Sequence, residues 1–153
     1  QHQRRECVGV KVNVYDAEGL AIGLRGDLSL PAGSANASSG EVDPTLGFLW
    51  SYALAKNSGL YGTVLLSSLT KSNGKRIFEA DAAVGMAFSL TDRVGSYVEY
   101  FGLYPDNAGP AHNINGGFTY LFTNYLQFDI NAGVGLNKRA NDFFAGVGLA
   151  WRW

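Results

Sequence analysis

The residues of this chain that could do chemistry are polar side chains that recur at every second position between apolar ones. A strand presents such residues on one face. The charged and amide candidates, with two aromatic residues of the same pattern, are Lys11, Arg25, Asp27, Glu79, Asp81, Tyr97, Glu99, Phe101, Gln127, Asp129, Asn131 and Arg152. Two interpretations are open. The charges form ion pairs that brace a narrow interior, or they line a polar pathway whose charge selects solutes.

The sequence predicts neither catalysis nor a bound metal or cofactor. Only two histidines occur, and His112 is expected to be a solvated residue at the end of a strand. The single cysteine, Cys7, excludes an internal disulfide and a cysteine-based metal site. No glycine-rich segment follows a strand and opens a helix, as a phosphate-binding loop would. The abundant glycines, including Gly133 and Gly148, are expected instead to leave room for larger neighbours.

The elements that position the polar residues are predicted to be strands. In residues 126–136, Leu126, Phe128 and Ile130 share one face, whereas Asp129 and Asn131 share the other. Each C-terminal segment is about 10 to 12 residues long, which suits a tilted transmembrane strand. The same alternation predicts nine segments: 8–15, 20–30, 45–54, 60–70, 77–90, 94–104, 113–122, 126–136 and 143–153. Tyr15 is expected on the polar face of the first segment, and segment 60–70 alternates too poorly for its faces to be assigned.

The predicted fold is all-β: a single domain, residues 1–153, forming an antiparallel up-and-down transmembrane β-barrel of 8–12 strands when complete. Short turns at Glu18, Ser58, Asp92 and Asn124 are assigned to the periplasmic end, and the loops 33–40 and 106–112 to the outside. Asn73-Gly74 predicts a type I′ hairpin turn. Nine strands conflict with the even count of bacterial barrels. A miscounted strand, missing N-terminal strands or an edge from another subunit would explain this; we favour missing N-terminal strands.

Composition agrees with this fold. The net charge is −1 and the pI about 6.1, so no basic field attracts nucleic acid. Charged residues make up only 16% of the chain, and the mean hydropathy of −0.02 is too polar for a helical membrane protein. A transmembrane barrel has such an average because half of each strand faces a polar interior. The expected location is the bacterial outer membrane.

Aromatic residues near strand ends predict contact with lipid at the membrane interfaces. These residues are Trp50, Tyr52, Tyr100, Tyr120, Trp151 and Trp153. The final strand, which ends at Trp153, is expected to be recognised by the barrel-assembly machinery, and a homo-oligomer is a further expected assembly. Aromatic side chains on the polar face, Tyr97, Phe101 and Phe144, are the candidates for a hydrophobic-ligand site.

Several segments resemble a known family. The stretches Asn115-Gly116-Gly117-Phe118-Thr119-Tyr120-Leu121, Tyr125-Leu126-Gln127-Phe128-Asp129 and Phe143-Phe144-Ala145-Gly146-Val147-Gly148-Leu149-Ala150-Trp151-Arg152-Trp153 are similar to the C-terminal part of the outer-membrane transporter family of the MetA-pathway of phenol degradation. The stretches around Leu28-Ser29-Leu30-Pro31-Ala32-Gly33 and Val98-Glu99-Tyr100-Phe101-Gly102 are also similar. The resemblance implies an outer-membrane barrel that passes small, often aromatic compounds.

Three functions remain open from the sequence. The first is a passive channel or uptake barrel for small hydrophobic or aromatic solutes. The second is a structural or self-assembling barrel whose open edge pairs with another chain. The third is a soluble, lipocalin-like barrel that binds a ligand inside. The third requires the apolar faces of residues 126–136 and 143–153 to point inward and Asp129, Asn131 and Arg152 to point outward.

Overall fold

The computed structural model describes residues 5–31, 41–71 and 73–152, and every regular element in this part of the chain is a strand. The elements are β1 (Arg5–Ala17), β2 (Leu20–Pro31), β3 (Asp43–Ala55), β4 (Ser58–Thr70), β5 (Arg76–Ser89), β6 (Val94–Pro105), β7 (Ala111–Leu121), β8 (Leu126–Gly135) and β9 (Phe143–Trp151). Among the described residues there is no helix long and apolar enough to cross a membrane. Trp153 lies outside the described residues.

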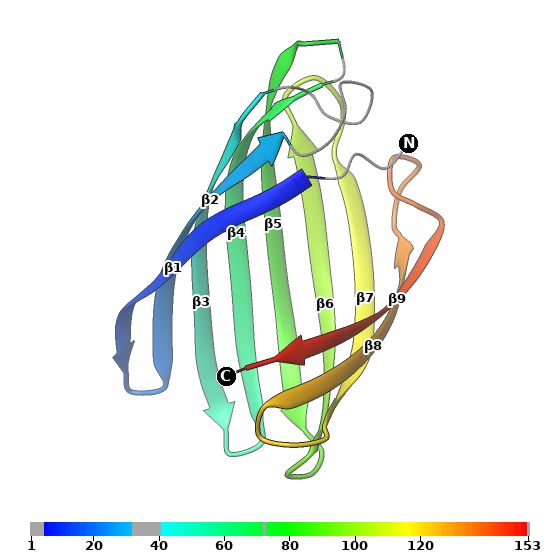
Figure 1. The fold of residues 1–153 in the computed structure, drawn as a ribbon. Helices are drawn as coiled ribbons and strands as arrows, with labels where there is room; N and C mark the ends of the chain where they lie inside the picture. Colours follow the sequence, from blue (N-terminus) through cyan, green and yellow to red (C-terminus); the bar gives the residue numbers. More distant parts are fainter. Residues whose placement is uncertain (1–4, 32–40, 72, 153) are drawn as a thin grey trace.

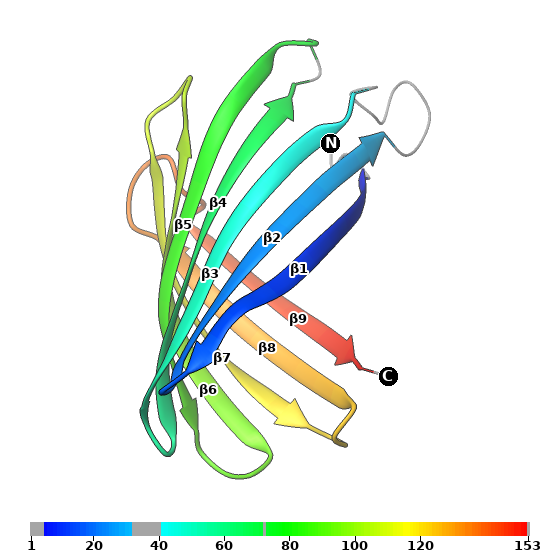
Figure 2. The same ribbon diagram turned by 90° about the vertical axis from the view of Figure 1, so that its left-hand side faces the viewer.

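The strands form one curved antiparallel sheet in which each strand pairs with its neighbours in sequence. This confirms the predicted all-β, up-and-down fold. Figures 1 and 2 show that the short turns lie at one end and the longer connections at the other. Among the described residues, β1 is paired only with β2, and β9 only with β8. Since the strand number is odd, these two edge strands run in the same direction, and a direct pair between them would be parallel.

The two faces of the sheet differ in chemistry, and strand alternation is the cause. We call the outer side of the curve the convex face and the inner side the concave face. Val147, Leu149 and Trp151 on the convex face are 72%, 72% and 76% exposed. Of the described hydrophobic residues, only Ile77 is buried. The sheet therefore has an apolar exterior and no apolar core, which is the reverse of a soluble barrel.

Register settles the facing of β4, which the sequence left open. Leu46 pairs with Leu66 and Phe48 with Val64, so Leu66 and Val64 share the convex face of β3. Leu65 and Tyr61 consequently lie on the concave face. Tyr61 thus shares the concave face with the polar residues of the other strands, although the poor alternation of β4 did not predict this.

A register shift in β1 corrects one predicted facing. The pairing passes from Asn13↔Gly23 to Tyr15↔Ile22, so Val14 is the extra residue of a β-bulge. A bulge reverses the alternation beyond it. Tyr15 therefore lies on the convex face with Ile22, and the prediction that it shares a face with Lys11 is wrong.

The hairpin turns also differ from the expectation in one place. Glu18 and Gly19 both have positive φ, 55° and 81°, which is the pattern of a type I′ turn. At the predicted type I′ turn only Gly74 has a positive φ, 76°, among the described residues. The Gly74 amide donates to the Lys71 carbonyl at 2.8 Å, and the Lys71 amide donates to the Lys75 carbonyl at 2.9 Å. The connection is therefore a longer loop closed by Lys71 and Lys75.

Candidate functional site

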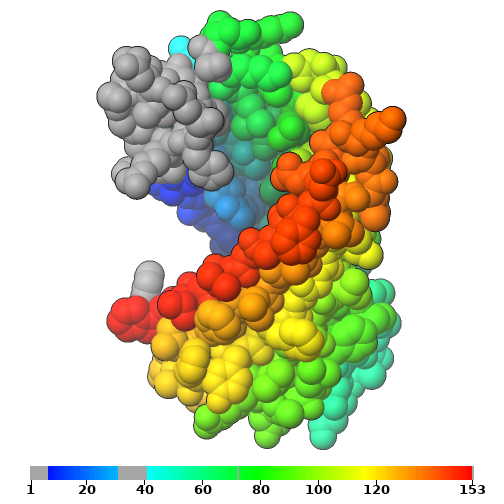
Figure 3. Space-filling model, turned by 90° about the vertical axis from the view of Figure 1, so that its right-hand side faces the viewer, coloured from blue at the N-terminus to red at the C-terminus, as the bar shows by residue number. Residues whose placement is uncertain are grey.

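The concave face carries the polar residues that the alternation singled out. Register pairs Lys11 with Arg25, Asp27 with Gly9, Asp81 with Leu65, Glu99 with Gly85 and Asp129 with Gly148. Each of the candidates within β1–β9 shares this face with its partner: Lys11, Arg25, Asp27, Glu79, Asp81, Tyr97, Glu99, Phe101, Gln127, Asp129 and Asn131. Figure 3 shows the molecule hollowed between β9, in red and orange, and the blue N-terminal strands.

Arg152 follows the end of β9 and lies at the rim. Its guanidinium donates to the Asn124 carbonyl at 3.2 Å, and its backbone amide donates to the Tyr125 carbonyl at 2.9 Å. Arg152 therefore braces the turn between β7 and β8, and the structure does not bring it together with the acids of the wall.

Glycines opposite large residues let side chains lie flat against the concave wall. A Cβ at Gly117 would lie 2.9 Å from the Tyr97 ring, and one at Gly146 would lie 3.3 Å from the Asn131 amide. The ring of Tyr61 covers Gly85 in the same way. Because these positions are glycines, the bulky neighbours can lie over them and do not project into the interior space. The sequence predicted this for Gly133 and Gly148.

Most charged residues on the concave face are separated from one another. Within the described part of the chain one ion pair is present, between Arg25 Nε and Asp27 Oδ2 at 2.5 Å. Glu79, Asp81, Glu99 and Asp129 are spread over β5, β6 and β8, and no described lysine or arginine forms a salt bridge with them. The Asn115 amide approaches Glu99 Oε1 at 3.5 Å. This arrangement favours a charged wall over an interior filled by ion pairs.

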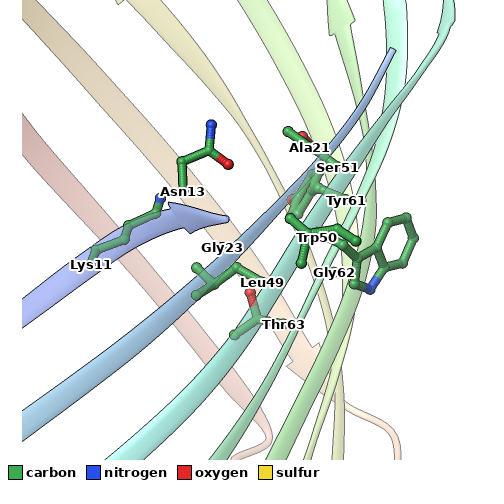
Figure 4. Close-up of a pocket in the computed structure, with 11 residues that line it drawn as sticks. Lys11, Asn13, Ala21, Gly23, Leu49, Trp50, Ser51, Tyr61, Gly62 and Thr63 are labelled. Carbon is green, nitrogen blue, oxygen red and sulfur yellow. The ribbon is translucent and has the colours of Figure 1, made fainter. Parts of the chain in front are cut away.

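A hollow of about 400 Å³ lies in the concave wall of β1–β4. Its concave-face lining contains one cation, several polar groups and an apolar part: Lys11, Asn13, Ala21, Gly23, Leu49, Ser51, Tyr61 and Thr63. Ile22, Trp50 and Gly62 also border it, although register assigns them to the convex face. Figure 4 shows Trp50 pointing away from Lys11 and Asn13. Sequence alone gave no sign of this hollow, because four strands contribute to it.

Aromatic residues occupy both faces. Trp50, Tyr52, Tyr100 and Tyr120 lie on the convex face by register, as does Trp151. On the concave face, Phe101 and Phe144 meet edge to face with ring centroids 5.8 Å apart, so two of the three residues expected to contact a hydrophobic ligand do touch.

His112 is part of a convex cluster that the sequence did not reveal. Its Nδ1 lies 2.6 Å from the Tyr100 hydroxyl, which in turn lies 3.3 Å from the Tyr104 hydroxyl. His112 is half-buried in this cluster, so its side chain makes specific contacts in addition to its remaining exposure. The pairing of His112 with Gly102 explains the contact, because it places His112 on the same face as both tyrosines.

Comparison with known proteins agrees with this geometry. A structure of OmpT, described as an in-vitro folded outer membrane protein of Vibrio cholerae in trimer form, is similar, with a TM-score of 0.56 and 14% identity. The match covers 97% of this chain and 56% of that one, so the chain spans just over half the length of the Vibrio protein. No curated protein matches the chain. The profile of the family described as "Putative MetA-pathway of phenol degradation" matches residues 7–153. The chain, a set of outer-membrane-type barrel strands, therefore belongs to the MetA-pathway of phenol degradation family.

Proposed function

We propose that this chain forms the wall of a passive channel in the bacterial outer membrane for small hydrophobic or aromatic solutes. The observation that carries the proposal is the division between faces on β8 and β9. The convex side presents Val147, Leu149 and Trp151 to the surroundings, whereas Asp129 and Asn131 lie on the concave side. Hydrocarbon suits the first set and a water-filled space suits the second.

The concave wall has the mixed character that such solutes need. Leu49, Leu65 and the Phe101–Phe144 pair offer apolar contact, and the carboxylates of β5, β6 and β8 keep the space hydrated. A wall of both kinds lets an aromatic ring slide along apolar side chains while its polar group remains solvated. The soluble alternative requires the opposite facing of β8 and β9, and the exposed apolar faces contradict it.

The two sheet edges support a second candidate, in which the sheet assembles with further strands and carries no solute. Unpaired edges do not persist in hydrocarbon, because their backbone groups find no partner there. A copy of the chain in the same orientation would offer β9 to β1 only as a parallel pair. Conductance in a planar bilayer separates the two candidates, since the assembly role predicts none.

Charge selection gives the channel proposal a quantitative test. In a salt gradient the wild-type pore is expected to prefer cations, because the acids of the wall outnumber its bases. The combined variant Glu79→Gln, Asp81→Asn, Glu99→Gln, Asp129→Asn is expected to reduce the cation-to-anion permeability ratio by about twofold or more. The ratio is read from the reversal potential. The matched control, Asp92→Asn with Asp106→Asn, removes acids from connections outside the wall and should leave it unchanged. An unaltered reversal potential in the wall variant would contradict the proposed pathway.

A further inference from the structure

Lys11 lies beside another cation on the concave face. Register places Lys11 directly opposite Arg25, and like charges in such a cross-strand pair repel. Asp27 binds Arg25 at 2.5 Å and so neutralises only one of the two. Within the described part of the chain no acid forms a salt bridge with Lys11. The Lys11 ammonium therefore has no ion-pair partner among the described residues, and Asp16, the second acid on the concave face of β1–β2, instead accepts from the Asn13 amide at 3.4 Å.

The Lys11 side chain lies over Gly23, which directs it towards the hollow of β1–β4. Its Cε is 3.7 Å from the position that a Cβ of Gly23 would occupy, and Leu49 Cβ is 3.9 Å from the same position. Figure 4 shows the Lys11 nitrogen reaching towards Asn13. A larger residue at Gly23 would fill the space over which the lysine stem lies.

The surrounding groups complete a site with a polar end and an apolar end. The Ser51 and Thr63 hydroxyls can donate hydrogen bonds, and both residues border the hollow with Lys11. Asn13 also borders the hollow, and its amide donates to Asp16 Oδ2 at 3.4 Å. Leu49 and Tyr61 also border the hollow and supply its apolar surface, although the far end of the Tyr61 ring lies over Gly85 on β5. The volume of about 400 Å³ is within the roughly 300–1,000 Å³ of small-molecule sites.

We propose that this hollow is a binding subsite for the carboxylate of a small aromatic acid. The carboxylate would accept hydrogen bonds from the Lys11 ammonium and the neighbouring hydroxyls, and the ring would pack on Leu49 and Tyr61. The inference rests on the proposed channel, because it places the subsite in the solute pathway. The acids without an ion-pair partner among the described residues of β5, β6 and β8 are Glu79, Asp81, Glu99 and Asp129, so a pore that prefers cations overall still offers an anion a local site beside Lys11.

Equilibrium binding of radiolabelled benzoate to the folded chain in detergent, at low salt, tests the subsite without relying on transport. Benzyl alcohol, which has the same ring and no charge, is the reference ligand. Benzoate is expected to bind about tenfold more tightly than benzyl alcohol, because its charge gains a partner. Lys11→Met should remove this preference and Lys11→Arg should retain most of it. Lys75→Met, in the loop between β4 and β5, is the matched control and should bind like the wild type.

Equal binding of both ligands, or undiminished benzoate binding by Lys11→Met, would overturn the subsite. Conductance measured on the same preparations tests the channel separately. Lys11-dependent binding without any conductance would refute the channel and leave the subsite standing. Conductance without Lys11-dependent binding would refute the subsite and leave the channel standing.

Discussion

Val147→Arg is expected to destabilise the membrane-inserted protein by about 2–4 kcal/mol, the cost of a cation on the lipid face of a barrel near the bilayer centre. Val147 lies midway along β9 on the convex face and is 72% exposed, so it has no protein core to lose. The decrease in the free energy of unfolding therefore depends on whether lipid or water touches the convex face. Denaturant unfolding in lipid vesicles gives the free energy of unfolding.

Asn131→Arg is the matched control for that measurement. Asn131 is next to Ile130, the residue paired with Val147, but it points to the concave face. The same arginine is therefore expected to cost well under half as much there. Equal losses for the two variants would contradict the assignment of hydrocarbon to the convex face, and a larger loss for Asn131→Arg would reverse it.

Asp43→Ala is expected to lower the free energy of unfolding by about 2–3 kcal/mol, because it removes a buried carboxylate that accepts two hydrogen bonds. Asp43 is 1% exposed and Thr70 is 2% exposed. Asp43 Oδ1 accepts from the Thr70 amide at 2.9 Å and from the Thr70 hydroxyl at 2.7 Å. These bonds join the first residue of β3 to the last residue of β4 at the end of the sheet where the longer connections lie.

Asp43→Asn separates the hydrogen bonds from the charge. The amide oxygen can accept the same two bonds, so this variant is expected to recover at least half of the loss, measured by the same unfolding experiment. If alanine and asparagine cost the same, or if alanine costs under about 0.5 kcal/mol, the bonds to Thr70 do not stabilise this end of the sheet.

Strict alternation explains why so much of the architecture follows from the sequence. Leu126, Phe128 and Ile130 can share a face in a strand only if Asp129 lies on the other, and the register confirms this. The facing of the predicted polar residues within the strands follows for the same reason, whereas Tyr61 was not predicted on the concave face and Arg152 lies at the rim. Alternation could not predict the facing of β4, because its adjacent leucines Leu65 and Leu66 lie on opposite faces. Only the pairing with β3 shows which face each occupies.

Features that depend on neighbouring strands could not be predicted from local patterns. The bulge at Val14 changes the facing of Tyr15, and no proline or glycine at this site indicates a bulge in the sequence. The hollow requires Lys11, Gly23, Leu49 and Thr63 from four strands to meet, and their sequence separations show no period. The contact of His112 with Tyr100 likewise arises from the cross-strand pairing of β6 with β7.

The central claim is that lipid touches the convex face and water the concave face. Single cysteines placed in turn at residues 127–132, in a Cys7→Ser background, test it directly in lipid vesicles made permeable to a charged maleimide. The account predicts rapid labelling at Gln127, Asp129 and Asn131 and protection at Phe128, Ile130 and Ala132. Rapid labelling at Phe128, Ile130 and Ala132 with protection of the other three positions would contradict the claim, and so would equal labelling at all six positions.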